Sequence, residues 1–112
     1  MPWQVTFHPE MAEDFAELSE EVQDALLAHA RLLEKVGPAL GRPAVDTLKG
    51  SRIANLKELR FSADGGVWRV AFAFDGRRIA VLLAGGDKAG VSAARFYRAL
   101  IAKAEQRWRT WE

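Results

Sequence analysis

Residues 55–84 read NLKELRFSADGGVWRVAFAFDGRRIAVLLA and contain three apolar runs separated by two turn signals. The first signal is SADGG and the second is Asp75-Gly76, a pair that is typical of a tight hairpin. Short runs rich in branched and aromatic side chains are typical of strands. The sequence therefore predicts three consecutive antiparallel strands, at 56–61, 67–74 and 79–84.

Side chains on the first two of these strands alternate in character. Because successive side chains of a strand point to opposite faces, Glu58 and Arg60 share one face, and Arg69 lies on the matching face of the next strand beside Ala71 and Ala73. The opposite face carries the large apolar residues Leu59, Phe61, Trp68, Val70, Phe72 and Phe74. We expect this apolar face to form the core and the charged face to be an open floor for a ligand.

An ordinary half-exposed sheet face explains part of the same pattern. Outward glutamate and arginine side chains often pair across strands and contribute about 0.2–1 kcal/mol per pair. Glu58 is therefore either a proton acceptor or the partner that holds Arg60 in place. Arg69 favours a functional role, because its alanine neighbours leave space where a solvated strand more often carries Thr, Lys or Glu.

The flanking segments predict one more strand and three helices. Residues 3–7 alternate as a strand, and Pro9 suits the first turn of a helix because the N–H it lacks would have no partner there. Ser19, followed by two glutamates, predicts an N-cap that separates two helices. Residues 92–108 predict the last helix. The expected order is βααβββα, an α+β fold in which an antiparallel sheet packs against helices.

The segment between the second helix and the next strand has little periodicity. Residues 38–51 contain glycines and prolines and only three large apolar residues, Leu40, Val45 and Leu48. The sequence predicts a loop here, which these apolar residues hold against the core.

Composition limits the class of protein. A chain of 112 residues with 49% hydrophobic and 28% charged residues predicts one domain over residues 1–112. No apolar run approaches the roughly 20 residues of a membrane-spanning helix, and no secretory signal is visible. The chain has no cysteine and only two histidines, His8 and His29, so a metal site is not expected. We expect a cytoplasmic protein without metal, cofactor or membrane partner.

The net charge of +1 hides an uneven distribution. Residues 1–48 hold three Lys/Arg and nine Asp/Glu, whereas residues 49–112 hold thirteen and six, so the two parts carry −6 and +7. An acidic helical face that pairs with basic neighbours would explain this division. A basic surface for a polyanion would also explain it, because phosphate backbones attract clustered Lys and Arg.

Several motifs occur together from about residue 3 to residue 104. They are LKELRF at 56–61, WRVAFAFDGRRIAVLLAGGDKAG at 68–90 and the helical FYRALIAKAEQRW at 96–108. In this order they resemble the RelE/HigB-type toxins of bacterial type II toxin–antitoxin systems, notably the phage-derived HigB-like branch of the RelE/ParE superfamily. The resemblance implies a small RelE-like fold with the active site on the concave face of the sheet.

The resemblance also implies an activity and partners. Family members commonly cut messenger RNA, often on the ribosome, and are silenced by an antitoxin that frequently carries a helix-turn-helix. The resemblance places Arg60, Arg69 and Lys88 as the basic site residues and Tyr97 as the aromatic residue of the last helix. Glu58 joins them as a possible proton acceptor.

These residues suit RNA cleavage by attack of the ribose 2′-OH on the adjacent phosphate. That reaction needs a proton acceptor, a proton donor for the leaving 5′-oxygen and positive charge over the phosphorane. Guanidinium groups can grip two phosphate oxygens at once, so the basic residues could act without a metal. Two other functions remain open, a toxin of the same fold that inhibits DNA gyrase and cuts nothing, and a non-toxic binding module.

Overall fold

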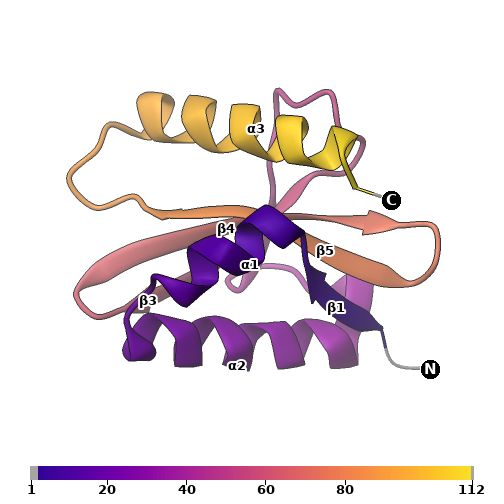
Figure 1. Cartoon of the computed structure of the whole chain (residues 1–112), viewed down its shortest axis with the longest axis horizontal. Coiled ribbons are helices and arrows are strands. Elements are labelled where there is room, and N and C mark those ends of the chain that lie inside the picture. Colours follow the sequence, from indigo (N-terminus) through magenta and orange to yellow (C-terminus); the bar gives the residue numbers. More distant parts are fainter. Residues whose placement is uncertain (1–2, 112) are drawn as a thin grey trace.

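The computed structural model describes residues 3–111. Its strands and helices are β1 (Gln4–Phe7), α1 (Pro9–Ala16), α2 (Glu20–Val36), the short 3-10 turn η1 (Gly37–Ala39), β2 (Val45–Thr47), β3 (Lys57–Ala63), β4 (Gly66–Asp75), β5 (Ile79–Asp87) and α3 (Ala93–Arg109). The sheet is the middle layer, with α3 on one face and α1 and α2 on the other (Figure 1). No helix in the described range is long and apolar enough to cross a membrane.

The sheet has the strand order β1-β5-β4-β3-β2. The hairpins β3–β4 and β4–β5 are antiparallel, as predicted, and the α+β class is confirmed. The sheet is mixed rather than wholly antiparallel, because β1 runs parallel to β5 with Gln4 aligned to Ile79 and Phe7 to Leu82. These two strands are far apart in the chain, so no tight turn dictates their relative direction.

Strand β2 lies inside the segment that was predicted to be a loop, so the expected order βααβββα lacks one strand. β2 pairs antiparallel with β3, with Val45 opposite Leu59 and Asp46 opposite Glu58. A strand of three residues is too short to show alternation, and it forms because β3 offers it an edge. Its pairing places Asp46 beside the charged face of β3.

The helix starts follow local capping chemistry. The predicted cap is confirmed, since the hydroxyl oxygen of Ser19 accepts a hydrogen bond from the N–H of Val22 at 3.3 Å. At the start of α1, His8 caps the helix through Nδ1, which accepts from the N–H of Glu10 at 3.0 Å. Pro9 occupies the first turn, where its missing N–H leaves no unpaired donor.

One hydrophobic core lies between the sheet and the layer of α1 and α2. It contains the apolar face predicted from β3 and β4, together with residues of the helices and of β5, among them Met11, Val22, Leu26, Leu33, Leu59, Val70, Phe72 and Leu82. Burial of a Leu or Phe side chain stabilises a fold by about 1.5–3 kcal/mol. This core therefore fixes the register of the two hairpins.

A second core lies between the opposite face of the sheet and α3. Ala71 and Ala73 are 0% and 1% exposed, and they pack with Leu83, Leu100 and Ala104. The expectation of an open floor is therefore wrong over this region. The alanines are small because a helix packs directly against them, whereas the sheet face is accessible around Arg60 and beside Arg69.

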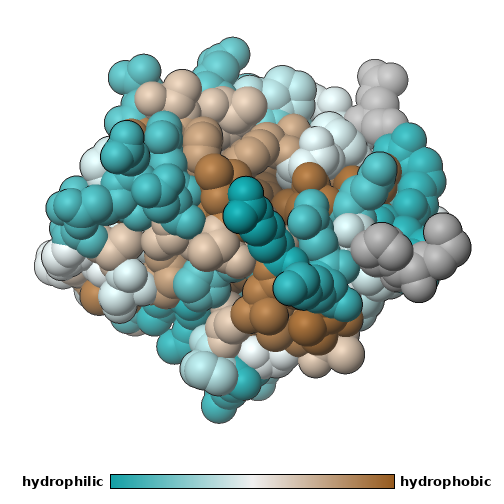
Figure 2. All heavy atoms as spheres, turned by 90° about the horizontal axis from the view of Figure 1, so that it is seen from below, coloured by the Kyte–Doolittle hydropathy of each residue, from teal (hydrophilic) through white to brown (hydrophobic). Residues whose placement is uncertain are grey.

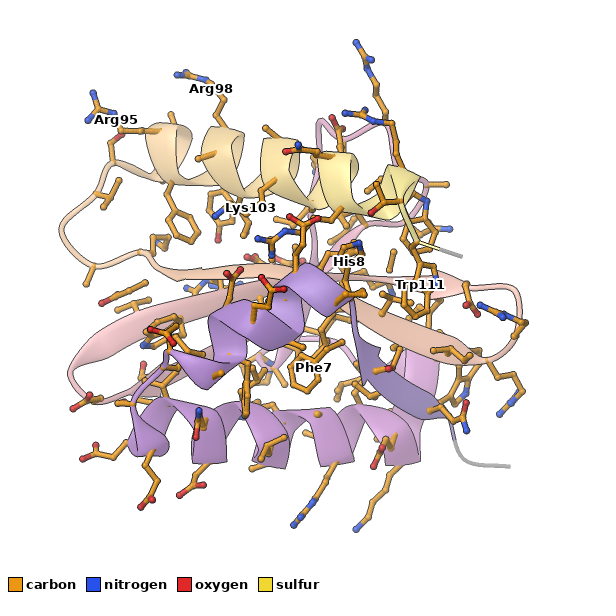
Figure 3. All side chains as sticks on the ribbon, in the orientation of Figure 1. Phe7, His8, Arg95, Arg98, Lys103 and Trp111 are labelled. Carbon is orange, nitrogen blue, oxygen red and sulfur yellow. The ribbon has the colours of Figure 1, made fainter. Side chains whose placement is uncertain are left out.

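The two charged parts of the chain form different layers. Acidic residues are exposed on α1 and α2, whose side of the molecule shows hydrophilic and hydrophobic patches together (Figure 2). Exposed basic residues follow α3, where Arg95 and Arg98 point away from the sheet (Figure 3). The layers are joined at buried Arg107, which donates to Asp14 Oδ2 and to the carbonyl of Leu83, both at 2.8 Å. Ion pairing between the layers thus accounts for one basic side chain of α3, Arg107. The exposed face of α3 remains positively charged.

Candidate functional site

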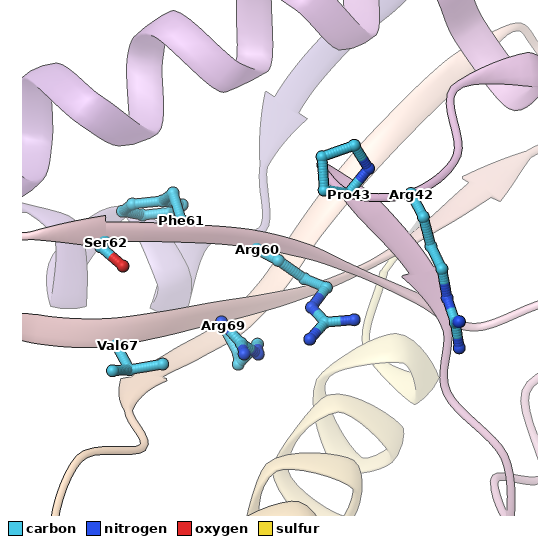
Figure 4. Close-up of a pocket in the computed structure, with 7 residues that line it drawn as sticks. All are labelled: Arg42, Pro43, Arg60, Phe61, Ser62, Val67 and Arg69. Atoms are coloured by element: carbon cyan, nitrogen blue, oxygen red, sulfur yellow. The ribbon is translucent and has the colours of Figure 1, made fainter.

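Two adjoining hollows lie on the sheet face that carries α3, in the region of β2, β3 and β4. The first has a volume of about 520 Å³ and is lined by Arg42, Pro43, Arg60, Phe61, Ser62, Val67 and Arg69 (Figure 4). The second, about 470 Å³, is lined by Asp46, Lys49, Glu58 and Tyr97 among others. Arg42 and Arg60 line both hollows, so their guanidinium groups form the ridge between them.

Arg69 is the buried cation at this site. It is 8% exposed and lies directly opposite Arg60 in the β3–β4 pairing. Its Nε donates to the hydroxyl of Tyr97 at 3.2 Å, and its Nη1 donates to the carbonyl of Trp68 at 2.9 Å. Like charges that face each other across strands are unfavourable, so this arrangement depends on nearby carboxylates.

Glu58 is the carboxylate nearest to Arg69. Its Oε1 lies 3.8 Å from Arg69 Nε, and both side chains are less than a tenth exposed. Within the described part of the chain, Glu58 Oε1 is buried and accepts no hydrogen bond. Burial raises the pKa of Glu58, while the Tyr97 hydroxyl and the guanidinium groups of Arg69 and Arg60 act in the opposite direction. A carboxylate with increased affinity for protons is suited to act as a base.

Arg60 does not use Glu58 as its close partner. Its Nη1 lies 3.4 Å from Asp46 Oδ2, and the same oxygen accepts from Arg42 Nε at 3.1 Å and Nη2 at 2.9 Å. The hydrogen bond from Arg42 is the main cause that lowers the pKa of Asp46, with the N–H of Thr47 adding to it. Asp46 therefore stays ionised and holds both guanidinium groups of the ridge.

Sequence reasoning missed Asp46 and Arg42. Both belong to the segment that was predicted as a loop, and no motif marks them. Their spacing of four residues has no meaning until β2 is paired with β3, which brings Asp46 opposite Glu58. The signal is the pairing of β2 with β3, which the residues of the segment do not show by themselves.

Tyr97 reaches the site from α3. Its hydroxyl accepts the hydrogen bond from Arg69, and burial raises the pKa of Tyr97. The phenol consequently keeps its proton, which it could give to a leaving group. Arg60, Arg69, Glu58 and Tyr97 are thus brought together around the two hollows.

Lys88 stands apart from the other predicted residues. It is half-buried and follows β5, where its N–H donates to the carbonyl of Val67 at 2.7 Å. That pairing places it beside the first hollow, but Lys88 is not among the residues that line either one. We propose only a peripheral role for Lys88.

The two histidines have structural surroundings. His8 is 3% exposed, its Nε2 lies 2.7 Å from Thr110 Oγ1, and its ring lies beside that of Trp111 (Figure 3). His29 stacks on Phe61 with ring centroids 5.1 Å apart. In the range 3–111, no group of three or more His, Cys, Asp or Glu is placed to hold a metal ion.

The raised pKa of Glu58 predicts a pH-dependent stability. A carboxyl whose pKa is higher in the folded chain binds more protons there, so its contribution to the free energy of unfolding falls as the pH rises from 4.5 through the raised pKa. We expect the free energy of unfolding of the unmodified chain to fall, relative to that of Glu58→Gln, as the pH rises across this range. Denaturant unfolding of both proteins at a series of pH values measures the difference.

Glu105 provides the control for this titration. The N–H of Arg52 and the hydroxyl of Ser51 bind its carboxylate and lower its pKa. Relative to Glu105→Gln, the unmodified chain should therefore gain stability as the pH rises, the opposite sign. Slopes of the same sign for both pairs would contradict the assignment of Glu58.

Comparison with known sequences places this geometry in a family. The family described as phage derived protein Gp49-like matches residues 13–109. "Putative toxin HigB3" of Mycobacterium tuberculosis (strain ATCC 25618 / H37Rv) is 42% identical over 103 residues, which cover 92% of this chain and 88% of that protein. "Putative toxin HigB2" of the same strain is 49% identical over 74 residues, or 65% of this chain. The matched part is 37% of the length of HigB2.

Solved structures show the same fold at low sequence identity. A double arginine-to-alanine mutant of the E. coli toxin RelE in the free state has a TM-score of 0.64 at 12% identity, covering 92% of this chain and 97% of its own. The archaeal RelE–RelB complex from Pyrococcus horikoshii OT3 has a TM-score of 0.59 at 18% identity. The match covers 81% of this chain and 100% of the matched chain. The RelE-like fold is confirmed. The chain therefore belongs to the Gp49-like family of phage-derived proteins, in the group of RelE/HigB-type toxins.

Proposed function

We propose that the chain is the toxin of a type II toxin–antitoxin pair and that it inhibits translation by cutting messenger RNA on the ribosome. The observation that carries this proposal is the buried Arg69, held by Glu58 and Tyr97 at the floor of an open hollow. A buried cation with proton-exchanging neighbours at an accessible surface is costly to maintain and suits a reacting phosphate. The toxin names of its relatives support the same function.

Each residue then has a role in cleavage by the 2′-OH. Arg69 and Arg60 stabilise the charge that develops on the phosphorane, which removes the need for a metal ion. Glu58 accepts the proton of the 2′-OH, and Tyr97 donates a proton to the leaving 5′-oxygen. Lys88 binds a phosphate outside the cut position.

The partners follow from the same proposal. The P. horikoshii structure holds RelE together with RelB, and we propose that a helix-turn-helix antitoxin likewise silences this chain. We further propose that the ribosome orients the message, because fixing two reacting groups in place can supply much of the rate that weak acid–base groups do not.

The test is a translation reaction with ribosomes, a defined message and the purified chain. We expect protein synthesis to stop and the message to be cut, with no DNA damage in cells that express the chain. Inhibition of gyrase would instead give DNA breaks with an intact message. The alternative of a gyrase inhibitor is disfavoured because it assigns no function to the buried cluster of Arg69, Glu58 and Tyr97.

Asp46→Asn should strengthen binding of RNA. The carboxylate of Asp46 competes with phosphate for the guanidinium groups of Arg42 and Arg60, so its neutralisation frees them. We expect a roughly two- to fivefold lower Kd for a short RNA at low salt, and a steeper dependence of Kd on salt. Asp75→Asn is the matched control, since it removes the ion pair with Arg77 at a remote hairpin and should leave the Kd unchanged. Weaker binding by Asp46→Asn would place the RNA elsewhere.

A further inference from the structure

The edge of β5 is not paired with another strand over its last residues. β1 pairs with β5 only as far as Leu82, and the carbonyl of Leu83 accepts from Arg107 Nη1 at 2.8 Å. Beyond this point, no strand of the described chain lies against that edge. Gly85 and Gly86 are both partly exposed although they lie within the strand.

The pairing of β5 with β4 shows which backbone groups face outward. The N–H of Lys88 donates to Val67 on the β4 side. Because successive residues of a strand direct their N–H and C=O to opposite sides, Gly86 also faces β4, whereas Gly85 and Asp87 face the open edge. A row of unpaired backbone groups is a template for an added strand.

An apolar groove lies beside this edge, against one side of α3. Its volume is about 280 Å³, and its apolar lining comes from Gly85, Val91, Phe96, Ala99 and Leu100. Val91 is 41% exposed, which is high for a large hydrophobic side chain in this chain. The groove therefore offers an apolar side chain a place next to the outward backbone of Gly85.

Two basic residues complete the lining of the groove. Arg95 and Lys103 are both exposed and belong to it, and they are eight residues, or about 12 Å, apart along α3. Within the described residues, neither forms an ion pair with an acidic side chain. This rim favours carboxylates on either side of an apolar group.

We propose that an extended segment of the antitoxin adds a short strand to the open edge of β5. The strand exchanges backbone hydrogen bonds with Gly85 and Asp87, places an apolar side chain in the groove and brings carboxylates to Arg95 and Lys103. Its alternate side chains face α1, where Glu10 and Asp14 already engage Arg107. The acidic and apolar residues of the segment therefore occupy every second position, on the side that faces the groove. The positions between them, which face α1, are not acidic. That the partner is an antitoxin rests on the proposed function. That the site binds an acidic and apolar extended segment rests only on its backbone edge, groove and basic rim.

The first experiment pans a displayed library of random 12-residue peptides on the full chain. We expect enrichment of peptides in which acidic and apolar residues recur at every second position. Arg95→Glu combined with Lys103→Glu should weaken binding of a synthetic copy of the best peptide at least tenfold. Arg98→Glu is the matched control, because Arg98 is exposed on the same helix, points into solvent (Figure 3) and does not line the groove; its Kd should change less than twofold.

Hydrogen exchange then tests the strand itself. With the peptide or with the co-expressed antitoxin bound, the amides of Gly85 and Asp87 should exchange at least tenfold more slowly. A peptide N-methylated at alternate backbone positions should lose this protection. No enrichment, equal binding by the rim variant, or unchanged exchange of these two amides would overturn the proposal. Arrest of translation is measured separately, so a failure of the proposed toxin activity does not alter the reading of these outcomes.

Discussion

Replacement of Arg69 by alanine should lower the rate of message cleavage by about 10²-fold or more. The guanidinium group is fixed by Tyr97 and by the carbonyl of Trp68, so it is already oriented when a phosphate arrives. Groups oriented in advance toward developing charge typically contribute factors of this size. The measurement is the rate at which a defined message is cut on translating ribosomes, at a saturating concentration of the chain.

The same replacement should also destabilise the fold. The sequence alone predicts that the fold stays intact, because the Arg69 side chain points to the sheet face opposite to that of Trp68 and Val70. In the structure, however, Arg69 lies 3.8 Å from the buried Glu58 carboxylate. Removing one member of a buried pair costs on the order of 3 kcal/mol. The double variant Glu58→Gln/Arg69→Ala should recover part of this stability and none of the cleavage, which separates chemistry from folding.

Arg77→Ala is the surface control for this prediction. Arg77 lies in the turn after β4 and pairs with Asp75 at 2.8 Å, far along the hairpin from the hollows. Its loss should change cleavage much less than the loss of Arg69. Equal arrest of growth by the two variants would remove Arg69 from the active site.

A message with a 2′-deoxy nucleotide at the cut position should resist cleavage completely. In the proposed reaction the 2′-oxygen is the nucleophile, and Glu58 accepts its proton, so the deoxy substrate has no attacking group. The measurement compares two messages that differ only at that nucleotide, on the same ribosomes. Normal cleavage one codon away in a tandem site serves as the internal control.

The ends of the products report the same chemistry. Attack by the 2′-oxygen forms a 2′,3′-cyclic phosphate, or a 3′-phosphate after its hydrolysis, and the leaving oxygen becomes a 5′-OH. The ends should be mapped with the ribosomes intact, because chelation of their magnesium would confuse the result. Products with 5′-phosphate and 3′-OH ends, or undiminished cutting at the deoxy nucleotide, would require a water nucleophile or a metal.

Local sequence signals predicted most of the fold. The hairpins of β3, β4 and β5 follow from alternation and turn residues, and the start of α2 follows from Ser19. The parallel position of β1 was missed because it depends on pairing with the distant strand β5, and β2 was missed because its three residues show no alternation of their own before they pair with β3. The cover of α3 over Ala71 and Ala73 was missed for a related reason. Small residues on a strand face indicate either an open floor or a closely packed helix, and alternation does not distinguish them.

Strand periodicity predicted that three of the candidate site residues lie together, but it did not predict their electrostatic partners or the contribution of Arg42 and Asp46. Arg60, Arg69 and Glu58 share a face because of strand periodicity alone. Strand periodicity did not reveal their partners. Glu58 lies near Arg69, and Arg60 pairs across strands with Asp46. Electrostatic partners depend on distances of a few ångström between separate elements, which no periodicity contains.

The buried Arg107 also fixes one end of α3, so that a small rotation of the helix about this point would displace its other end. It joins that helix to α1 and β5 near one end, and Tyr97 lies ten residues, or about 15 Å, nearer the other. A pivot of about four degrees at Arg107 would therefore move the Tyr97 hydroxyl by about 1 Å, and a displacement of that size can cost a reaction about 10²-fold. In the proposed reaction, a molecule that moves α3 slightly away from the sheet would therefore slow cleavage without contacting the site.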